Sequence, residues 1–323
     1  MSTYLVTGVA GFIASKTAEF LLEEGHRVVG VDNMNDYYDI RLKNHRLSNL
    51  RTRQNFNFCQ MDIESREDLE KLFRQHSFDA IVNLAAYSGF PYSIVNPGIY
   101  FSTNVTGTLN ILESMREYGV SKLVIASSSS VYAGQKMPFK ENLAVNEPIS
   151  PYAASKKSAE VLCYSYHALF GIDISILRYF TVFGPCGRPD MCIFRFIKWI
   201  AEDQPIQLTG DGSQSRDFTY LEDIARGTIA ALKPVGYEVF NLGGGNNPVS
   251  LNQIIQWIEE SLGKKAIIET IPFHKADMNA TKADIFKAES ILGWKPEVEI
   301  KEGVLKCVEW YQQNQSWLKD IKL

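Results

Sequence analysis

Short apolar runs alternate with longer amphipathic stretches through the first half of the chain. The runs are YLVTG, RVVGVD, FNFCQMDI, AIVNLAA, KLVIASS and ISILRYF, and the amphipathic stretches include residues 15–24 and 67–75. Such short runs are typical of strands that are buried on both faces of a sheet, and helices between them form βαβ units. The pattern therefore predicts an α/β fold built on a Rossmann-type, doubly wound parallel sheet.

The alternation weakens after Arg178. Loops such as FGPCGRPDM and TGDGSQSRDF appear there among helical segments such as residues 193–202, and EVFNLGGG then resembles one more buried strand. We therefore expect two interleaved domains. The predicted Rossmann domain comprises residues 1–180 with a return of about 218–247, and a smaller mixed α/β substrate domain comprises 181–217 and 248–323.

Composition narrows the choice of partners. Hydrophobic residues make up 45% of the 323 residues, enough for a large core, and the formal net charge of −4 argues against nucleic acid and anionic membranes. No apolar run approaches the ~20 residues that span a bilayer, and the first residues lack the pattern of a secretion signal. The five cysteines form no CxxC pair. We expect a soluble, cytoplasmic protein without a metal site.

A glycine loop follows the first predicted strand. In TGVAGFIA, Gly8, Gly11 and Ala14 lie between a strand and a helix, where backbone N–H groups can meet a pyrophosphate. A tight turn alone could also use glycines, but the next strand ends at Asp32. Its carboxylate can accept bonds from both adenosine ribose hydroxyls and would repel a 2′-phosphate, so the cofactor is predicted to be NAD rather than NADP. Asp62 could accept a bond from the adenine amino group.

Tyr152 and Lys156 are the candidate catalytic pair. Their spacing of four places both on one face of a helix, where the ammonium can stabilise the phenolate. A tyrosine with a pKa near 10 is a poor base at neutral pH, so a lysine and a nicotinamide cation are needed to lower that pKa. YxxxK alone also fits an ordinary amphipathic helix, but here it follows the glycine loop and the serine-rich strand end SSSSVYAG.

These three features, in this order, resemble the extended short-chain dehydrogenase/reductase family and, within it, the nucleotide-sugar 4-epimerases. NLAA, TNVTGT, LRYFTVFGP and GDGSQSRDFTYLEDIARG extend the resemblance along most of the chain. It implies that Ser128 holds the sugar's 4-hydroxyl and relays its proton, that Tyr152 is the base, and that Lys156 holds both Tyr152 and the nicotinamide ribose.

The resemblance also implies two sets of binding residues. The NAD contacts would be Gly8, Gly11, Phe12, Ile13, Asp32, Asn33, Asp62, Ile63, Leu84, Ala85, Ala86, Asn104, Ser127, Tyr152, Lys156, Tyr179 and Val182. The contacts of the UDP-sugar substrate would be Ser88, Ser128, Ser129, Tyr152, Thr181, Arg188, Arg216 and Asp277.

The serine-rich segment bears on the type of reaction. Related 4,6-dehydratases carry an Asp-Glu pair where this chain has Ser129 and Ser130, and UDP-glucuronate decarboxylases carry a glutamate at the position of Ser130. Two serines are poor substitutes for the acid and base that dehydration needs. Inversion at carbon 4 through a 4-keto intermediate is therefore predicted, with dehydration, decarboxylation and a non-catalytic NAD-binding protein as alternatives.

The identity of the sugar is less sharply indicated. DNMNDYYDIRLKNHRL and RYFTVFGPCGRPDM resemble UDP-glucuronate 4-epimerases, which implies conversion of UDP-glucuronate to UDP-galacturonate. Pro91 and His274, however, stand where relatives carry arginines, and Thr281 would not exclude an N-acetylated hexose. UDP-glucose and UDP-N-acetylglucosamine therefore stay open as substrates.

Two helical stretches, residues 103–117 and 153–170, carry apolar faces. Burial inside one subunit would explain these faces. The resemblance instead implies that they pair with their copies in a four-helix bundle, so a homodimer is predicted.

Overall fold

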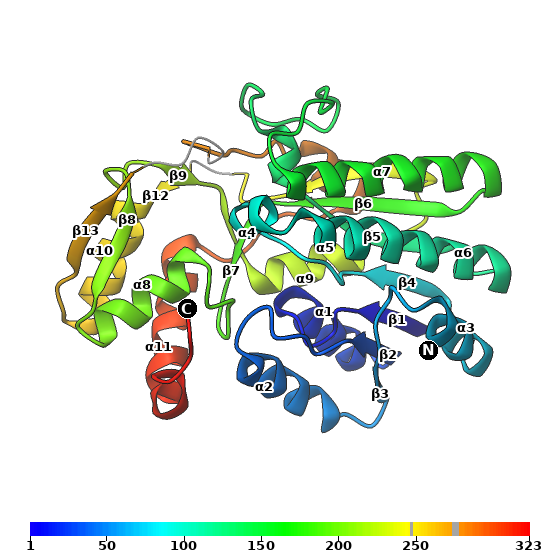
Figure 1. The fold of residues 1–323 in the computed structure, drawn as a ribbon, viewed down its shortest axis with the longest axis horizontal. Helices are drawn as coiled ribbons and strands as arrows, with labels where there is room; N and C mark the ends of the chain where they lie inside the picture. The colour runs from blue at the N-terminus through cyan, green and yellow to red at the C-terminus, as the bar shows by residue number, and fades with distance from the viewer. Residues whose placement is uncertain (246–247, 273–277) are drawn as a thin grey trace.

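A seven-stranded parallel sheet forms the centre of the computed structural model, which describes residues 1–245, 248–272 and 278–323 (Figure 1). The strand order is β3-β2-β1-β4-β5-β6-β11, and every neighbouring pair is parallel. The strands are β1 (Thr3–Thr7), β2 (Arg27–Asp32), β3 (Phe56–Gln60), β4 (Ala80–Asn83), β5 (Lys122–Ser128), β6 (Asp173–Tyr179) and β11 (Tyr237–Leu242). The predicted fold class is confirmed.

Helices cover both faces of this sheet (Figure 1). One layer contains α3 (Arg66–Gln75), α6 (Thr108–Tyr118) and α7 (Pro151–Phe170), and the other contains α1 (Phe12–Glu23), α2 (Ile40–Arg51) and α9 (Leu221–Ala230). Side chains of a strand alternate between the faces, so Leu5 packs under the first layer and Val6 under the second. Burial on both faces explains the uninterrupted apolar runs.

Capping residues fix where several of these helices begin. The Ser150 hydroxyl accepts the N–H of Ala153 at 3.2 Å, so α7 begins at Pro151, two residues before the predicted start. Ser65 caps α3 in the same way through the N–H of Asp68. The strand predicted over 56–63 ends at Gln60, which leaves Asp62 and Ile63 in the following loop.

The helix predicted over residues 103–117 is interrupted. Its first part is a π-helix, η1 (Ser102–Gly107), which is followed by α6. The wide turn places Gly107 so close to Ile63 that a Cβ at position 107 would lie 2.6 Å from the Ile63 Cδ1 atom. Single π-turns are frequent at functional sites, and this one carries the candidate residue Asn104.

A smaller unit with its own apolar core lies beside the sheet, at the left of Figure 1. Three two-stranded pairs contribute to it: β7 (Thr181–Phe183) with β10 (Phe218–Tyr220), β8 (Pro205–Thr209) with β13 (Ile267–Ile271), and β9 (Ser215–Arg216) with β12 (Val249–Ser250). Its helices are α8 (Cys192–Ala201), α10 (Leu251–Leu262) and α11 (Ile300–Leu318). Between these segments, α9 packs along α1 and β11 pairs with β6, so the chain returns to the main sheet.

The remaining helical segments are short. They are α4 (Phe90–Val95), α5 (Pro97–Phe101), the 3-10 helix η2 (Ser129–Tyr132) and the π-helix η3 (Ala288–Leu292). In the three described stretches of the chain, no helix combines the length and apolar character that a membrane span requires.

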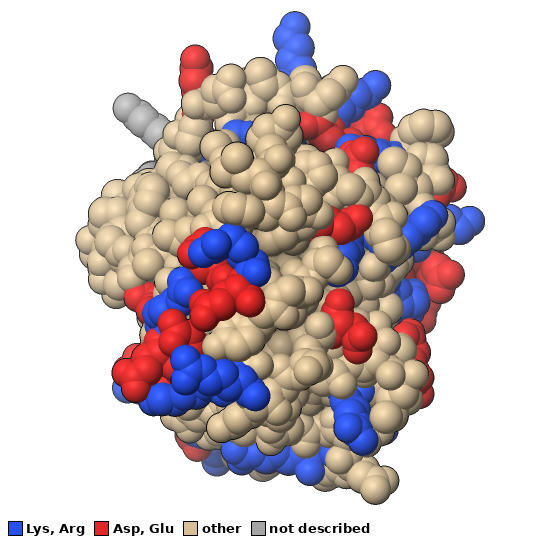
Figure 2. Space-filling view, turned by 90° about the vertical axis from the view of Figure 1, so that its right-hand side faces the viewer, with Lys and Arg blue, Asp and Glu red and all other residues tan. Residues whose placement is uncertain are grey.

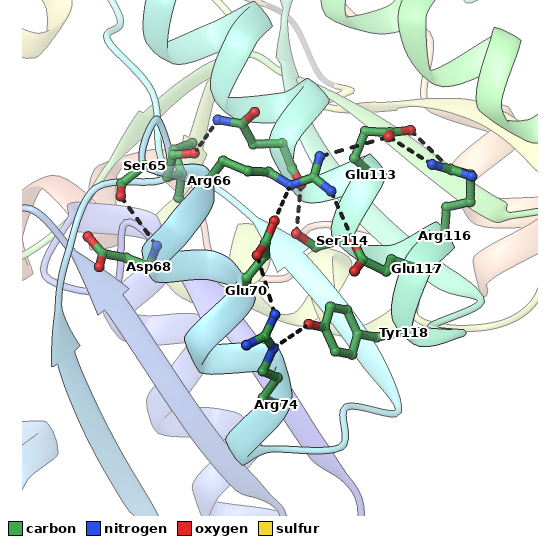
Figure 3. A network of polar contacts seen from close by, with 12 residues as sticks. Ser65, Arg66, Asp68, Glu70, Arg74, Glu113, Ser114, Arg116, Glu117 and Tyr118 are labelled. Carbon is green, nitrogen blue, oxygen red and sulfur yellow. Dashed lines mark hydrogen bonds and ion pairs between the residues drawn. The ribbon is translucent and has the colours of Figure 1, made fainter.

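A polar network joins α3 to α6 on the outside of the first helical layer (Figure 3). Arg66 pairs with Glu70 at 3.3 Å within α3 and with Glu117 of α6 at 2.9 Å, and Arg74 donates to the Tyr118 hydroxyl at 3.2 Å. Solvent-exposed pairs of this kind contribute little stability individually. Their effect is to mark this flank of α6 as a solvated surface, in contrast to the apolar surface of α7 described below.

Candidate active site

The glycine loop lies at the point where the strand order reverses. The carboxyl ends of β1 and β4 are neighbours, while their connections leave in opposite directions, and such a switch point opens a crevice. Gly8 has a φ of +69°, and a Cβ there would lie 2.8 Å from the Ala85 Cα atom. The Thr7 hydroxyl accepts the N–H groups of Leu84 and Ala85, each at 3.1 Å. The loop therefore packs directly on the residues that follow β4.

The first turn of α1 fits a phosphate group. Gly11 is its N-cap and provides no side-chain cap, so the N–H groups at this end have no hydroxyl or carboxylate to bind them. A Cβ at Gly11 would lie 2.7 Å from the carbonyl oxygen of Gly8, so the tight loop requires glycine here as well. The exposed amides and the helix dipole both favour an anion. These observations fit the pyrophosphate of a dinucleotide.

The buried carboxylate of Asp32 ends β2. Its Oδ2 accepts the N–H of Ala10 at 3.1 Å and its Oδ1 accepts that of Met34 at 2.8 Å. The ammonium of Lys43, from α2, lies 3.6 Å from Asp32 Oδ1, and burial lowers the pKa of this lysine. Sequence reasoning missed Lys43, although it lies in the segment that was singled out. Together the two groups offer acceptors and a donor to ribose hydroxyls.

Asn33 and Asp62 form a second polar group beside Asp32. The Asn33 amide donates to Asp62 Oδ2 at 2.7 Å, while Asp62 Oδ1 accepts the N–H of Glu64 at 2.9 Å. Ile63 is buried against Gly107 of the π-helix. The structure thus brings together, at the ends of β2 and β3, the residues for which an adenosine contact was predicted.

Ser128, Tyr152 and Lys156 meet at the carboxyl end of β5. Burial has the largest effect on the Tyr152 phenol and raises its pKa, while the neighbouring Ser128 hydroxyl and the Arg188 charge lower that pKa. Lys156 donates to the carbonyl of Ala126 at 2.9 Å, and burial lowers its pKa to about 8. We expected Lys156 to lower the pKa of Tyr152; in the structure, Ser128 and Arg188 do so.

The serines of SSSSVYAG have different surroundings. Ser128 accepts the N–H of Ser130 and contacts its hydroxyl, each at 3.1 Å, as η2 begins. Ser129 is buried in η2. The Ser127 hydroxyl instead donates to Glu160 Oε1 at 2.6 Å. Sequence reasoning missed Glu160, which belongs to the same helix as the candidate catalytic pair, Tyr152 and Lys156.

Asn104 joins the loop after β4 to α7. Its side chain exchanges two hydrogen bonds with the backbone of Tyr87, both at 3.0 Å, and donates to the Ser155 hydroxyl at 2.9 Å. These three hydrogen bonds engage the Asn104 side chain inside the protein. Asn104 therefore fixes the loop that carries Ala86 against the helix that carries Tyr152.

Arg188 and Ser88, two of the predicted substrate contacts, lie together beside Tyr37. The Arg188 guanidinium contacts the Ser88 hydroxyl and pairs with Asp190 through Nε, 3.0 Å from Oδ1. The Tyr37 hydroxyl donates to the Ser88 carbonyl at 2.7 Å and lies 3.1 Å from the Tyr100 hydroxyl. The Tyr100 ring in turn contacts the Tyr152 ring edge-on, with centroids 6.0 Å apart. Neither Tyr37 nor Tyr100 was identified from the sequence.

Four predicted residues line a cavity, while the hydroxyl of a fifth is buried in the interior. Thr181, Val182, Arg188 and Phe12 line one small cavity of about 20 Å³. The Tyr179 hydroxyl instead lies 2.8 Å from Thr228 Oγ1 and is buried against α9, so only other parts of this residue could face a cofactor.

Three further predictions concern the phosphate and sugar contacts. Arg216, on β9, donates to the carbonyls of Ser215 at 3.0 Å and Asn279 at 3.4 Å. The buried Thr281 hydroxyl accepts the N–H of Asp217 at 3.1 Å, so it is engaged inside the smaller unit. Asp277 and His274 lie outside the described residues.

A glycine loop at the switch point, with a serine, tyrosine and lysine at the next strand end, is typical of a dinucleotide-dependent short-chain dehydrogenase/reductase of the extended type. Comparison with known proteins agrees. The sequence profile of the NAD dependent epimerase/dehydratase family matches residues 4–243. The chain belongs to this family.

Individual relatives are similar over their full length. UDP-glucuronate 4-epimerase from Thermodesulfobacterium geofontis (strain OPF15) is 57% identical over 323 residues, which is 100% of both chains. The crystal structure of UDP-glucuronic acid 4-epimerase from Bacillus cereus in complex with UDP-glucuronic acid and NAD has 37% identity and a TM-score of 0.91, covering 97% of this chain and 99% of that one. UDP-glucose 4-epimerase from Thermotoga maritima with UDP-glucose has 30% identity and a TM-score of 0.85, covering 97% and 99%.

Proposed function

We propose that the protein is an NAD-dependent 4-epimerase that interconverts UDP-glucuronate and UDP-galacturonate through a 4-keto sugar. The observation that carries this proposal is the meeting of Ser128, Tyr152 and Lys156 at the carboxyl end of β5, where the Ser128 hydroxyl lowers the pKa of the Tyr152 phenol, with serines rather than acidic residues at 129 and 130. This arrangement suits reversible proton removal from one hydroxyl and lacks the acid and base for dehydration. The full-length similarity to UDP-glucuronate 4-epimerases supports the choice of sugar.

The cofactor site that we propose comprises the glycine loop, the amide end of α1, Asp32 with Lys43, and the Asn33 and Asp62 pair. These residues would hold NAD, which would supply a reversible hydride acceptor for carbon 4 of the sugar. Asp32, held by the N–H groups of Ala10 and Met34, would receive the ribose hydroxyls.

Proton transfer is assigned to the chain's own residues. Tyr152 takes the proton of the 4-hydroxyl, and Ser128, whose hydroxyl already lowers the pKa of the phenol, holds the 4-hydroxyl and relays the proton. In the structure the Arg188 charge lowers the pKa of Tyr152, and we propose that the ammonium of Lys156, anchored on the Ala126 carbonyl, adds a second positive charge that favours the tyrosinate. Because burial raises the pKa of Tyr152, the base depends on positive charge nearby.

Substrate contacts follow from the positions of the polar residues around Tyr152. Arg216 would bind the diphosphate, which must be held while the sugar turns over. Arg188 already pairs with Asp190, so we assign recognition of the sugar carboxylate to the hydroxyls of Ser88, Ser129 and Thr181. Pro91 lies in the first turn of α4 and provides no charge, which favours UDP-glucose as the second candidate substrate.

Product analysis tests the proposed function. Purified protein is incubated separately with UDP-glucuronate, UDP-glucose and UDP-N-acetylglucosamine, and the nucleotide sugars are separated by chromatography. We expect UDP-galacturonate from the first and little turnover of the others. Formation of a pentose and carbon dioxide would identify a decarboxylase, and faster inversion of UDP-glucose would select the second candidate.

We further propose a homodimer that forms through α6 and α7. Three apolar side chains of α7 are largely exposed: Val161 at 55%, Tyr164 at 57% and Leu169 at 73%. Figure 2, which shows the right-hand side of Figure 1, has a wide uncharged area above a band of charged side chains. Exposed apolar side chains on one helix favour association. The five free thiols are typical of the cytoplasm, where we place the protein.

Substitution at this surface is expected to separate the subunits. Val161→Glu would place a charge in the proposed bundle, so light scattering should report a monomer where the unmodified protein is a dimer. The matched control is Ile268→Glu, which adds the same charge at an exposed isoleucine on β13, at the far side of the molecule. A dimer that survives Val161→Glu, or is absent from the unmodified protein, contradicts this interface.

A further inference from the structure

A buried ion pair lies directly behind the catalytic residues and has no role in the mechanism above. Glu160 and Arg178 are 3% and 2% exposed, and two parallel hydrogen bonds of 2.8 Å join Arg178 Nε and Nη2 to the two carboxylate oxygens. Replacing such a pair with apolar residues is often neutral or stabilising. Stability alone therefore does not account for the pair.

The carboxylate of Glu160 reaches the strand end that carries the active site. Its Oε1 accepts the Ser127 hydroxyl at 2.6 Å as well as Arg178 Nε. Ser127 lies between Ala126, whose carbonyl binds the Lys156 ammonium, and Ser128, whose hydroxyl lowers the pKa of the Tyr152 phenol. One carboxylate thus holds the short segment on which both catalytic side chains of α7 depend.

Arg178 extends the same anchor to other elements. Its Nη1 donates to the Tyr132 hydroxyl at 2.8 Å, and Tyr132 donates onward to Asn241 Oδ1 at 2.8 Å. The end of β5, the end of η2, the end of β6 and β11 are therefore connected through Glu160 and Arg178. Movement of the carboxylate would be transmitted to all four.

The spacing of residues along α7 also places the charge of Glu160 where it acts on Lys156. Tyr152, Lys156 and Glu160 follow at intervals of four, so they share one buried face of α7. Burial lowers the pKa of Lys156 to about 8, and the charge of Glu160 opposes that effect. Among the groups that the structure describes, Glu160 is the only charge found to shift the pKa of Lys156.

The tyrosines and the cysteine around this face keep their protons between neutral pH and pH 10. Burial raises the pKa of Tyr100 from α5, of Tyr132 from η2, of Tyr237 from β11, and of Tyr152 and Cys163 on α7 itself. Arg178 stays protonated because Glu160 binds it, and Lys157 contacts Glu160 Oε2 at 3.4 Å from the edge of the helix.

We propose that Glu160 is a positioning residue of the active site: its carboxylate fixes the Ala126–Ser128 strand end and keeps the Lys156 ammonium protonated. Lys156 then retains its charge over the pH range in which Tyr152 must act as a base. The kinetic consequence rests on the proposed epimerase function, whereas the charge of Lys156 does not.

The test compares Glu160→Gln with the unmodified protein. Lysine residues are labelled with ¹³C, the Lys156 signal is assigned by its loss in Lys156→Gln, and its titration is followed by NMR. Removing the carboxylate should lower the Lys156 pKa by about one unit. In kinetics, the basic limb of the kcat pH profile should move down with it, and kcat should fall more than KM rises.

Two further variants keep the test decisive. If Glu160→Gln leaves Arg178 unpaired and does not fold, Glu160→Gln with Arg178→Gln removes both charges, and the same downward pKa shift is expected. Ser127→Ala removes the bond to the strand end but keeps the carboxylate, so kcat should fall while the lysine titration stays in place.

Asp173→Asn is the matched control. It breaks the 2.5 Å pair between Lys122 and Asp173, which joins β5 to β6 at their opposite ends, away from the active site. Its Lys156 titration and its kcat pH profile should match those of the unmodified protein. A folded Glu160→Gln variant in which neither the Lys156 titration nor the basic limb moves would overturn the proposal. If the titration moves but no UDP-sugar is inverted, the positioning role stands and the proposed function fails.

Discussion

Tyr152→Phe is expected to lower the rate of UDP-glucuronate inversion by about 10²–10⁴-fold, the range typical of a lost general base. The substitution removes the phenol hydroxyl, whose pKa Ser128 lowers, and leaves the ring, whose edge contact with Tyr100 has centroids 6.0 Å apart. Fold and NAD binding should therefore be retained. The measurement is the initial rate of UDP-galacturonate formation, with bound NAD determined in the same preparation.

Tyr179→Phe provides the control for this result. It removes a phenol hydroxyl that is also buried. The Tyr179 hydroxyl, however, bonds Thr228 of α9 and not a serine of the segment Ser127–Ser130. Its rate should stay within a few-fold of the unmodified protein, with some loss of thermal stability from the broken hydrogen bond. Equal rates for Tyr152→Phe and the unmodified protein would show that another group is the base.

Gly8→Ala should weaken NAD binding by about 100-fold, because both conformation and space require glycine at this position. The φ of +69° is strained for alanine, and the added Cβ would lie 2.8 and 2.9 Å from the Cα and N atoms of Ala85. Backbone cannot rotate away as a side chain can, so the loop must shift from the switch point. Calorimetric titration of cofactor-free protein with NAD measures the effect.

Gly25→Ala separates conformation from contact. Gly25 has a φ of +83°, similar to that of Gly8, but an added Cβ finds no atom within 4 Å. This variant should therefore lose roughly 1–2 kcal/mol of stability from the left-handed conformation and bind NAD normally. If both variants bind NAD equally well, the glycine loop does not hold the cofactor in the way we propose.

Local periodicity in the sequence was sufficient to predict the α/β class and the position of most elements. Buried strands and amphipathic helices differ in period, and this difference depends only on neighbouring residues. The interruption at Ser102–Gly107 was missed because six residues are too few to show a change of helical period. Strand ends were also misplaced, as in β3, since the apolar residues Met61 and Ile63 extend the pattern after the chain has left the sheet at Gln60.

The candidate site was predicted where its residues are close in sequence. Tyr152 and Lys156 are four apart, and the glycine loop is a single turn. The contact between Arg188 and Ser88 spans 100 positions, and the bond of Tyr37 to Ser88 spans 51. Such pairs leave no local pattern, which is why Tyr37, Tyr100 and Lys43 were not identified.

The sequence by itself determined the class of protein, the glycine loop, and the shared helical face of Tyr152 and Lys156, since each depends on residues within a few turns of one another. Only the tertiary structure decided how these groups are charged. Burial raises the pKa of Tyr152 and lowers that of Lys156, and Glu160 opposes the latter effect through a carboxylate held by Arg178 and Ser127. Desolvation depends on every element packed around a group, and no stretch of sequence contains that information.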